Sequence, residues 1–159
     1  LSLRMYEHLM DEARAAGFEH YEISNFCLPG WRSRHNSAYW QGTPYVGFGP
    51  GAHSYDGRRT RRWNQADLGA YVAAGDGEPP HECEVLTDRE LYDELVMTRL
   101  RTCGGLPLGL LADDDRAYCT AQAAPHLRAG RLELARGALR LTRKGIFTSN
   151  DIISDLMRV

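Results

Sequence analysis

An imidazole, an amide and two large aromatic side chains stand together in the segment SRHNSAYW, residues 33–40. His35 is able to ligate a metal and Asn36 to orient it, while Tyr39 and Trp40 offer flat faces to a planar ligand. The segment has neither clear helical nor clear strand periodicity, so we expect a loop. Two interpretations stay open: a surface loop pinned by its aromatic side chains, and the wall of a ligand pocket.

A second segment that could contact a ligand is GFGPGAHS, residues 47–54, in which three glycines alternate directly after a predicted strand. Glycine lets a ligand approach the backbone closely, so main-chain amides and carbonyls of this segment could contact an adenine, a ribose or a carboxylate. Alternating glycines are also found in tight turns that bind no ligand, so this alternative stays open. The third glycine of the dinucleotide fingerprint is absent and no helix follows, which excludes that motif. His53 ends the segment, where a lone histidine is typical of a hydrogen-bonded structural residue.

Two further groups of polar residues have both a functional and a structural interpretation. A run of four arginines could clamp carboxylates or phosphates, although such runs are usually solvated loops. Three residues at a predicted strand end could polarise a ligand, and they could equally cap the following loop. The first group is Arg58, Arg59, Arg61 and Arg62, and the second is Glu22, Ser24 and Asn25.

Composition narrows the functional classes. The 159 residues carry a formal charge of -2, which provides no global field to attract nucleic acid or an anionic membrane. No apolar run approaches the roughly 20 residues that span a bilayer, and the N-terminal residues lack the pattern of a signal peptide, so we expect a cytoplasmic protein. The cysteines form no C-x-x-C pair and no compact ligand cluster, and are expected to be mainly small core residues: Cys27, Cys83, Cys103 and Cys119.

The first third of the chain predicts a helix over residues 2–17, a strand over 20–24 and a strand over 45–49. Short apolar strands after helices indicate α/β organisation with a mostly parallel sheet, in which ligands gather at the carboxyl ends of strands. The chain opens on a helix already under way, so we expect it to be part of something longer.

The rest of the chain predicts a mostly helical region. Asn64 is expected to cap a helix that ends near Ala74, and the Gly- and Pro-rich residues 75–84 are expected to form a linker. The sequence TDRE, residues 87–90, is a capping box. It opens a helix that should end at residues 104–105.

After that helix, the sequence predicts a second helix from Asp113 to Ala124, with Pro125 at its exit. The segments RLELA and ALRLT then predict a β-hairpin, and a last helix should bury its isoleucines and Leu156. Helix, helix, hairpin and helix is close to a winged-helix order. That order suggests nucleic-acid binding as one alternative, but its presumed recognition helix begins with three aspartates, from Asp113 to Asp115, which would repel phosphate.

Taken together, these segments resemble a known family. The stretch from Tyr21 to Ser54 resembles proteins related to oxygen-independent coproporphyrinogen III oxidase, in the branch regarded as haem chaperones. HNSAYW matches the H-N-x-x-Y-W signature of that branch, and GFGPGAHS is similar to its glycine-rich strand end near S-adenosylmethionine. ELVMTRLRTCGGL and LRLTRKGIFTSNDIISDL resemble the C-terminal domain of the same family.

The resemblance implies an α+β chain: the C-terminal strands and helices of a partial (β/α) radical S-adenosylmethionine barrel, followed by a mostly helical, winged-helix-like domain. The implied divisions are 1–57 for the barrel part, 58–84 for a connecting helix and linker, and 85–159 for the helical domain with its hairpin. The family's C-x-x-x-C-x-x-C motif, which holds an iron-sulfur cluster, is absent here, so this chain alone should perform no radical chemistry. We expect the missing N-terminal barrel region, or an oligomer partner, to cover the exposed sheet edge.

The resemblance also assigns roles to residues. His35 becomes the candidate haem ligand, in a setting made by Asn36, Tyr39 and Trp40. Backbone contact with S-adenosylmethionine is assigned to a second group: Gly49, Gly51, Ala52 and His53.

The first functional hypothesis is therefore haem binding and delivery to an acceptor protein, with arginines available to the haem propionates. The second is oxidative decarboxylation of coproporphyrinogen III by the full-length protein, and the third is the winged-helix nucleic-acid module. The first involves neither nucleic acid nor a membrane span.

Overall fold

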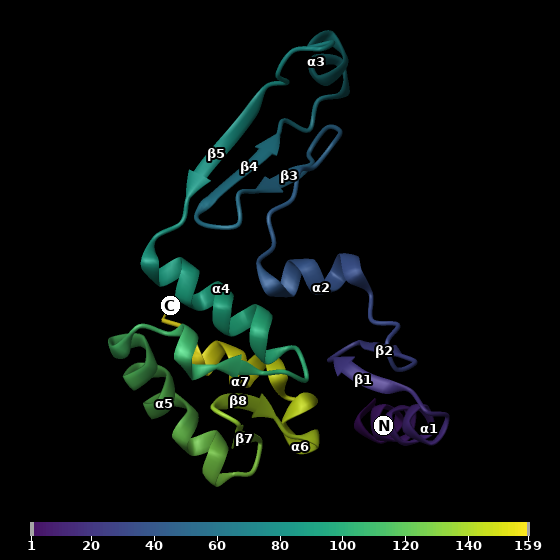
Figure 1. The fold of residues 1–159 in the computed structure, drawn as a ribbon, viewed down its shortest axis with the longest axis vertical. Helices are drawn as coiled ribbons and strands as arrows, with labels where there is room; N and C mark the ends of the chain where they lie inside the picture. The colour runs from purple at the N-terminus through teal and green to yellow at the C-terminus, as the bar shows by residue number, and fades with distance from the viewer. Residues whose placement is uncertain (1, 159) are drawn as a thin grey trace. The chain divides into compact units, whose positions relative to one another are not determined.

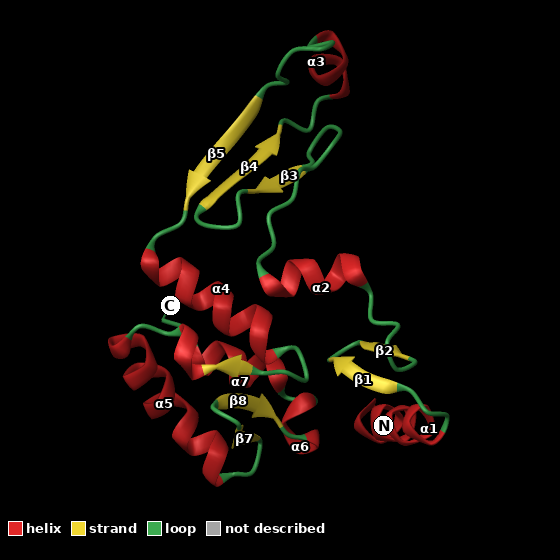
Figure 2. Ribbon diagram, viewed as in Figure 1, coloured by secondary structure: helices red, strands yellow, loops and turns green. Residues whose placement is uncertain are grey.

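The computed structural model describes residues 2–158. The chain divides into two compact units: unit 1, made of Leu1–Ser37 with Tyr92–Val159, and unit 2, made of Ala38–Leu91 (Figure 1). Helices and short antiparallel strands both occur along the chain (Figure 2), which agrees with the expected α+β class. Every strand pairing among the described residues is antiparallel, in one two-stranded and two three-stranded sheets. The prediction of a mostly parallel sheet is therefore wrong: three of the five strand pairs are joined by short turns, where a parallel pair would need a long crossover.

The N-terminal part of unit 1 consists of a helix and a hairpin. Helix α1 (Ser2–Ala15) is followed by Gly17, whose φ of 82° lets the chain leave the helix. Strands β1 (Glu19–Glu22) and β2 (Asn25–Cys27) then pair antiparallel. The predicted first helix and first strand are thus confirmed.

The C-terminal part of unit 1 holds the main hydrophobic core. Twelve buried side chains from its helices and strands form one cluster, which includes the fully buried Val96, Leu100, Leu106 and Ile152. Its elements are α4 (Asp88–Leu100), of which residues 92–100 belong to unit 1, β6 (Leu106–Pro107), the 3-10 helix η1 (Leu108–Leu110), α5 (Asp113–Arg128), β7 (Leu132–Ala135), β8 (Ala138–Leu141), α6 (Arg143–Ile146) and α7 (Ser149–Leu156).

The hairpin of this region forms as predicted. Arg136 and Gly137 connect β7 to β8 with φ values of 52° and 76°, and two successive positive φ values are the mark of a type I′ turn. Strand β8 lies in the middle of the sheet, between β6 and β7. The sequence signal was strong because alternating leucines flank a dipeptide that ends in glycine.

Two helix predictions need correction. Pro125 lies inside α5 instead of at its exit, and the helix continues to Arg128. Only one intrahelical hydrogen bond is lost to the proline, and buried His126 and Ala123 keep this last part of the helix packed. The expected last helix is two helices, α6 and α7, because Thr142 caps a separate short turn through its hydroxyl.

Unit 2 is built around the sheet β3 (His53–Tyr55), β4 (Thr60–Asn64) and β5 (His81–Val85), with the short helix α3 (Leu68–Ala73) between β4 and β5. The strand expected over residues 45–49 is reduced to an isolated bridge between Tyr45 and Tyr55. The stretch expected to be a linker is a strand from His81 onward.

The cap of α3 is also not the predicted one. Asp67 accepts a hydrogen bond from the backbone of Ala70, whereas Asn64 ends β4 and is buried. Its side chain donates to the Gly49 carbonyl at 3.0 Å. Asn64 therefore ties the glycine segment to the sheet instead of opening a helix.

Candidate functional site

The segment SRHNSAYW forms a helix, α2 (Arg34–Gln41), so the loop prediction for it is wrong. Ser33 caps this helix: its hydroxyl accepts a hydrogen bond from the Asn36 amide at 3.2 Å, and its carbonyl accepts one from the Ser37 amide at 3.0 Å. Eight residues are too few to show a clear period in the sequence, which is why the cap was the only available signal.

Helix α2 gathers the four aromatic and polar candidates on one side. His35 and Tyr39 are one turn apart, as are Asn36 and Trp40, and successive residues turn by about 100°, so the four lie within one half of the helix surface. His35 and Tyr39 are exposed, while Asn36 and Trp40 are half-buried. The helix thus presents an imidazole and a phenol ring to solvent.

A chain of hydrogen bonds within unit 1 connects Asn36 to a buried carboxylate. The Asn36 side chain donates to the Asn25 side chain at 3.5 Å, and Asn25 in turn donates to Glu22 at 2.5 Å. Glu22 is 2% exposed and also accepts from the Ser24 amide at 2.9 Å. The loop-capping interpretation of Glu22, Ser24 and Asn25 is therefore the one that their contacts support.

Arg101, which sequence reasoning did not single out, completes this network. It donates through Nε to Glu22 Oε1 at 3.0 Å, and its Nη2 lies 2.8 Å from the same oxygen. The backbone joins the same two segments, because the Ile23 amide donates to the Arg101 carbonyl at 3.1 Å and the Cys103 amide to the Tyr21 carbonyl at 3.0 Å. The ion pair thus fastens the β1 end to the segment that follows α4.

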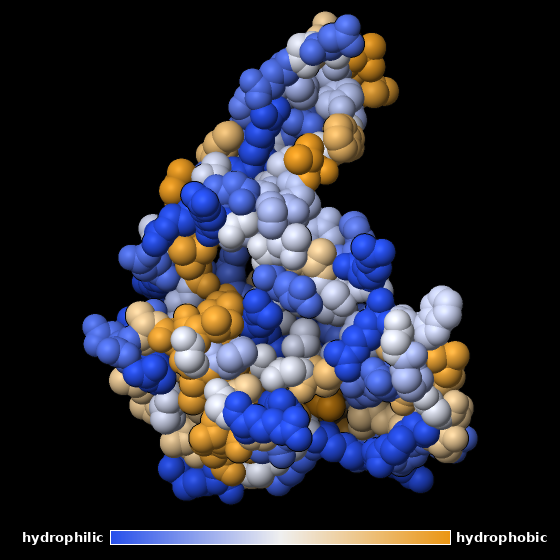
Figure 3. Space-filling view, in the orientation of Figure 1, coloured by the Kyte–Doolittle hydropathy of each residue, from blue (hydrophilic) through white to orange (hydrophobic). Residues whose placement is uncertain are grey.

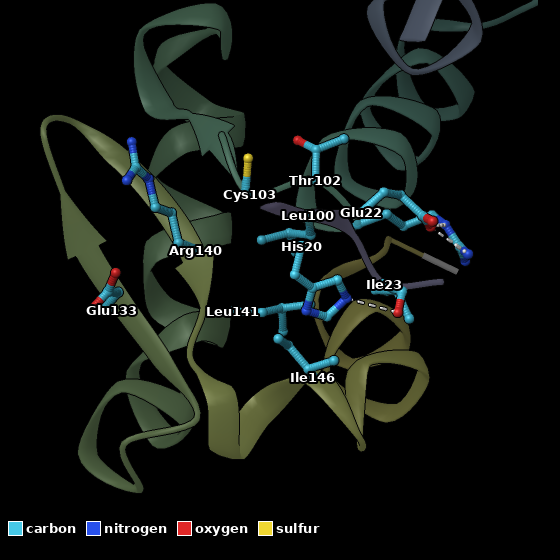
Figure 4. Close-up of a pocket in the computed structure, with 11 residues that line it drawn as sticks. His20, Glu22, Ile23, Leu100, Thr102, Cys103, Glu133, Arg140, Leu141 and Ile146 are labelled. Carbon is cyan, nitrogen blue, oxygen red and sulfur yellow. Dashed lines mark hydrogen bonds and ion pairs between the residues drawn. The ribbon is translucent and has the colours of Figure 1, made fainter. Parts of the chain in front are cut away.

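A cavity of about 220 Å³ lies beside this ion pair within unit 1 (Figure 4). The His20 ring lies near Leu141 and Ile146, and Cys103 and Arg140 lie above it and to its left in this view. The lining residues are His20, Glu22, Ile23, Leu100, Arg101, Thr102, Cys103, Glu133, Arg140, Leu141 and Ile146.

The tautomer of His20 follows from its partners. Ile23 O accepts from the Tyr6 hydroxyl at 2.5 Å and lies 3.0 Å from His20 Nε2. A carbonyl oxygen only accepts, so Nε2 carries the proton and Nδ1 is an acceptor in the neutral ring. Phe26 stacks on the same ring, with centroids 4.2 Å apart.

The glycine segment lies in unit 2, and its backbone groups are engaged with the sheet. Gly49 O accepts from the Ala52 amide at 3.3 Å, and the Gly51 amide donates to the Gln65 carbonyl at 3.3 Å. Both glycines have positive φ, at 109° and 69°. His53 is exposed on β3, and its ring stacks on Trp63 with centroids 5.9 Å apart.

The arginines of β4 and the turn before it are mostly paired with acidic residues of unit 2. Arg59 pairs with Asp88 and Arg62 with Glu78, and Arg61 Nη1 lies 3.6 Å from Glu84 Oε1. This arrangement agrees with the solvated interpretation of the run better than with a ligand clamp.

The cysteines do not assemble a metal site. All four are free; Cys27 and Cys119 are buried, as expected for core residues, whereas Cys83 and Cys103 are exposed. Within residues 2–158, no group of three or more His, Cys, Asp or Glu side chains could hold a metal ion. None of the helices in that range is both long enough and apolar enough to cross a membrane.

Comparison with known proteins places this geometry in a family. Residues 86–148 match the model of the HemN C-terminal domain. The heme chaperone HemW of Mycobacterium tuberculosis (strain ATCC 25618 / H37Rv) is 36% identical over 154 residues, which cover 96% of this chain and 38% of that relative. HemW of Bacillus subtilis (strain 168) is 39% identical over 103 residues, 63% of this chain and 27% of the relative. The chain thus spans about two fifths of the first relative and less of the second.

The fold has a counterpart among solved structures. Coproporphyrinogen III oxidase (HemN) from Escherichia coli, described as a radical SAM enzyme, superposes with a TM-score of 0.66 at 16% identity, over 96% of this chain and 40% of that chain. The class defined by these matches is the radical S-adenosylmethionine proteins. Within that class, this chain belongs to the HemN/HemW-like family and corresponds to its C-terminal part.

Proposed function

We propose that this chain binds haem through His35 and that the protein delivers haem to an acceptor protein. The observation that carries the proposal is the exposed side of α2, where a capped helix holds His35 and Tyr39 one turn apart. Its support from the comparisons is a 36% identity, over 96% of this chain, to relatives named heme chaperone.

The chemistry assigned to each residue is simple. A neutral imidazole nitrogen of His35 supplies the lone pair for iron, and exposed Arg34 next to it supplies a cation for a propionate. Tyr39 and Trp40 provide aromatic surface for the macrocycle. Asn36, tied through Asn25 to buried Glu22, keeps the first turn of α2 in place, so Glu22 and Arg101 act as positioning residues.

The rest of the proposal concerns the longer protein. Residues 2–158 contain no group of three or more His, Cys, Asp or Glu side chains that could hold a metal ion, so an iron-sulfur cluster and the radical chemistry of S-adenosylmethionine would depend on residues outside this range. Gly49, Gly51, Ala52 and His53 would shape a wall near S-adenosylmethionine. We also propose that residues 1–57 form part of a (β/α) barrel, that residues 58–84 connect it to the next domain, and that residues 85–159 form a winged-helix-like C-terminal domain. The proposed location of the protein is the cytoplasm.

A haemin titration followed by the Soret band tests the assignment of His35. We expect His35→Ala to weaken haemin binding by about tenfold or more, since one iron–imidazole bond is lost, and to change the Soret maximum. His8→Ala is the matched control, because His8 is an exposed histidine on another helix. Equal spectra and affinities for His35→Ala and the unsubstituted protein would show that the assigned ligand is wrong.

A further inference from the structure

The sheet of unit 2 has one protected edge and one open edge. At the β3 edge, Tyr45 bridges Tyr55 through two backbone hydrogen bonds of 3.0 and 2.9 Å. At the other edge, all five residues of β5 are exposed. Strand β5 pairs only with β4 in this sheet, and an edge strand of exposed residues is a template on which another strand can pair.

The register shows which backbone groups face outward. A hydrogen-bonded residue pair lies just beyond each end of the β4–β5 pairing. The Gln65 amide donates to the Pro80 carbonyl at one end, and the Leu86 amide donates to the Arg59 carbonyl at the other, both at 2.9 Å. Hydrogen-bonded pairs alternate along an antiparallel ladder, so Glu82 and Glu84 bond to β4. The N–H and C=O groups of His81, Cys83 and Val85 therefore point away from β4, toward the open edge.

The side chains of the edge carry a charge pattern. Glu82 and Glu84 are two residues apart and lie on the same face, opposite Trp63 and Arg61 of β4. Across the two strands, the positive Arg61 lies next to the negative Glu84, with 3.6 Å between their charged groups. A basic residue on a neighbouring strand would continue this alternation. Residues 38–91 contain eight acidic residues and five arginines, so the unit as a whole also favours a cation.

Pairing of β5 with a second copy of itself is disfavoured by the same charges. An antiparallel pair centred on Cys83 would set Glu82 opposite Glu84 of the other copy, and centres on Glu82 or Glu84 would set each opposite itself. Like charges directly opposite each other destabilise a strand pair. The surface over β5 is mainly hydrophilic (Figure 3), so apolar contact gives little compensation.

We propose that the β5 edge binds an extended basic segment of a partner protein as a fourth strand. The segment carries Lys or Arg at alternate positions, facing Glu82 and Glu84, and its backbone pairs with His81, Cys83 and Val85. The recognised pattern is basic, any residue, basic.

The proposal is tested by measuring, with fluorescence anisotropy, how tightly the protein binds a short labelled peptide in which Lys alternates with Val. Cys83→Pro removes one outward N–H but no hydrogen bond to β4, and we expect it to weaken binding about tenfold. Cys83→Ala keeps the N–H and is the matched control. Glu82→Lys should weaken binding at least about threefold, and added salt should weaken binding to the unsubstituted protein.

Three results would overturn the proposal. The first is equal binding of a peptide in which Glu replaces Lys. The second is unchanged binding by both Cys83→Pro and Glu82→Lys. The third is sedimentation of the unsubstituted protein as a dimer that Cys83→Pro dissociates, because β5 would then be covered by a second copy. Circular dichroism of each variant checks folding, and Glu82→Lys carries the test if Cys83→Pro unfolds.

Discussion

Single residues in this chain are constrained mainly by close backbone approach and by buried charge. Gly47 passes so near β3 that a Cβ there would lie 2.1 Å from the His53 carbonyl oxygen. Glu22 is buried and receives hydrogen bonds from three residues. The sequence drew attention to both positions but left a ligand role and a structural role open for each, because a motif does not show whether a ligand or another part of the chain fills the neighbouring space.

Gly47→Ala should destabilise unit 2 by about 1–3 kcal/mol, since the added methyl group meets backbone that cannot move aside cheaply. The φ of Gly47 is not positive, so the effect is steric alone. Urea unfolding followed by Trp fluorescence measures it. Gly109→Ala is the control because its Cβ has no neighbour within 4 Å, and an equal loss for both variants would contradict the steric explanation.

Glu22→Gln should lower the free energy of unfolding by about 2 kcal/mol. The amide leaves Arg101 without its anionic partner, and the cost is moderated because the Arg101 side chain is 34% exposed. Glu133→Gln, at an exposed position lining the same cavity, should change stability by less than about 0.5 kcal/mol. Similar values for the two variants in urea unfolding would show that the ion pair contributes nothing.

At the scale of elements, predictions succeeded where a signal lies within a few residues. The TDRE capping box and the turn between β7 and β8 were identified because local chemistry determines them. The strand β5 was missed, since HECEV has weak strand propensity and forms only where β4 supplies a partner. The helix α2 was missed for the same kind of reason. Its cap residue could be recognised in the sequence, but the side chains of Tyr21 and Asn25, which hydrogen-bond to its first residues, come from elsewhere in the chain.

The capping box of α4 predicts a pH dependence. The hydrogen bond from the Thr87 amide lowers the pKa of the Glu90 carboxyl below its ordinary value. Because the folded pKa is depressed, the stabilisation is complete above the ordinary value and is lost as pH falls through the lowered one. Glu90→Ala should therefore lower the Tm at pH 7, and the deficit should shrink near about pH 2–3.

Glu90→Gln serves as the control for that measurement, since an amide oxygen accepts the same hydrogen bond but does not titrate. The Tm difference between the Gln and Ala variants should be the same at both pH values. A deficit of Glu90→Ala that stays constant down to the lower pH would show that the ionised carboxylate is not what stabilises the helix.

At the scale of the whole molecule, apolar burial is distributed unequally between the two units. The twelve-residue hydrophobic cluster lies entirely in unit 1. Among residues 38–91, all of which the structure describes, Leu86 is the one buried apolar side chain. Unit 2 therefore depends on backbone pairing, exposed ion pairs and rings such as His53 on Trp63.

This inequality predicts that unit 2 opens before unit 1. In native-state hydrogen exchange, the β4 amides that bond to β5 should exchange at least about tenfold faster than amides in the middle of α5, because local opening follows the apolar area that must be exposed. Ile152→Ala, which deletes a fully buried side chain of unit 1, should lower protection in α5 by about 3 kcal/mol and leave the β4 rates unchanged. Equal protection of β4 and α5, or a parallel loss in both after the substitution, would mean that the two units unfold as one cooperative body.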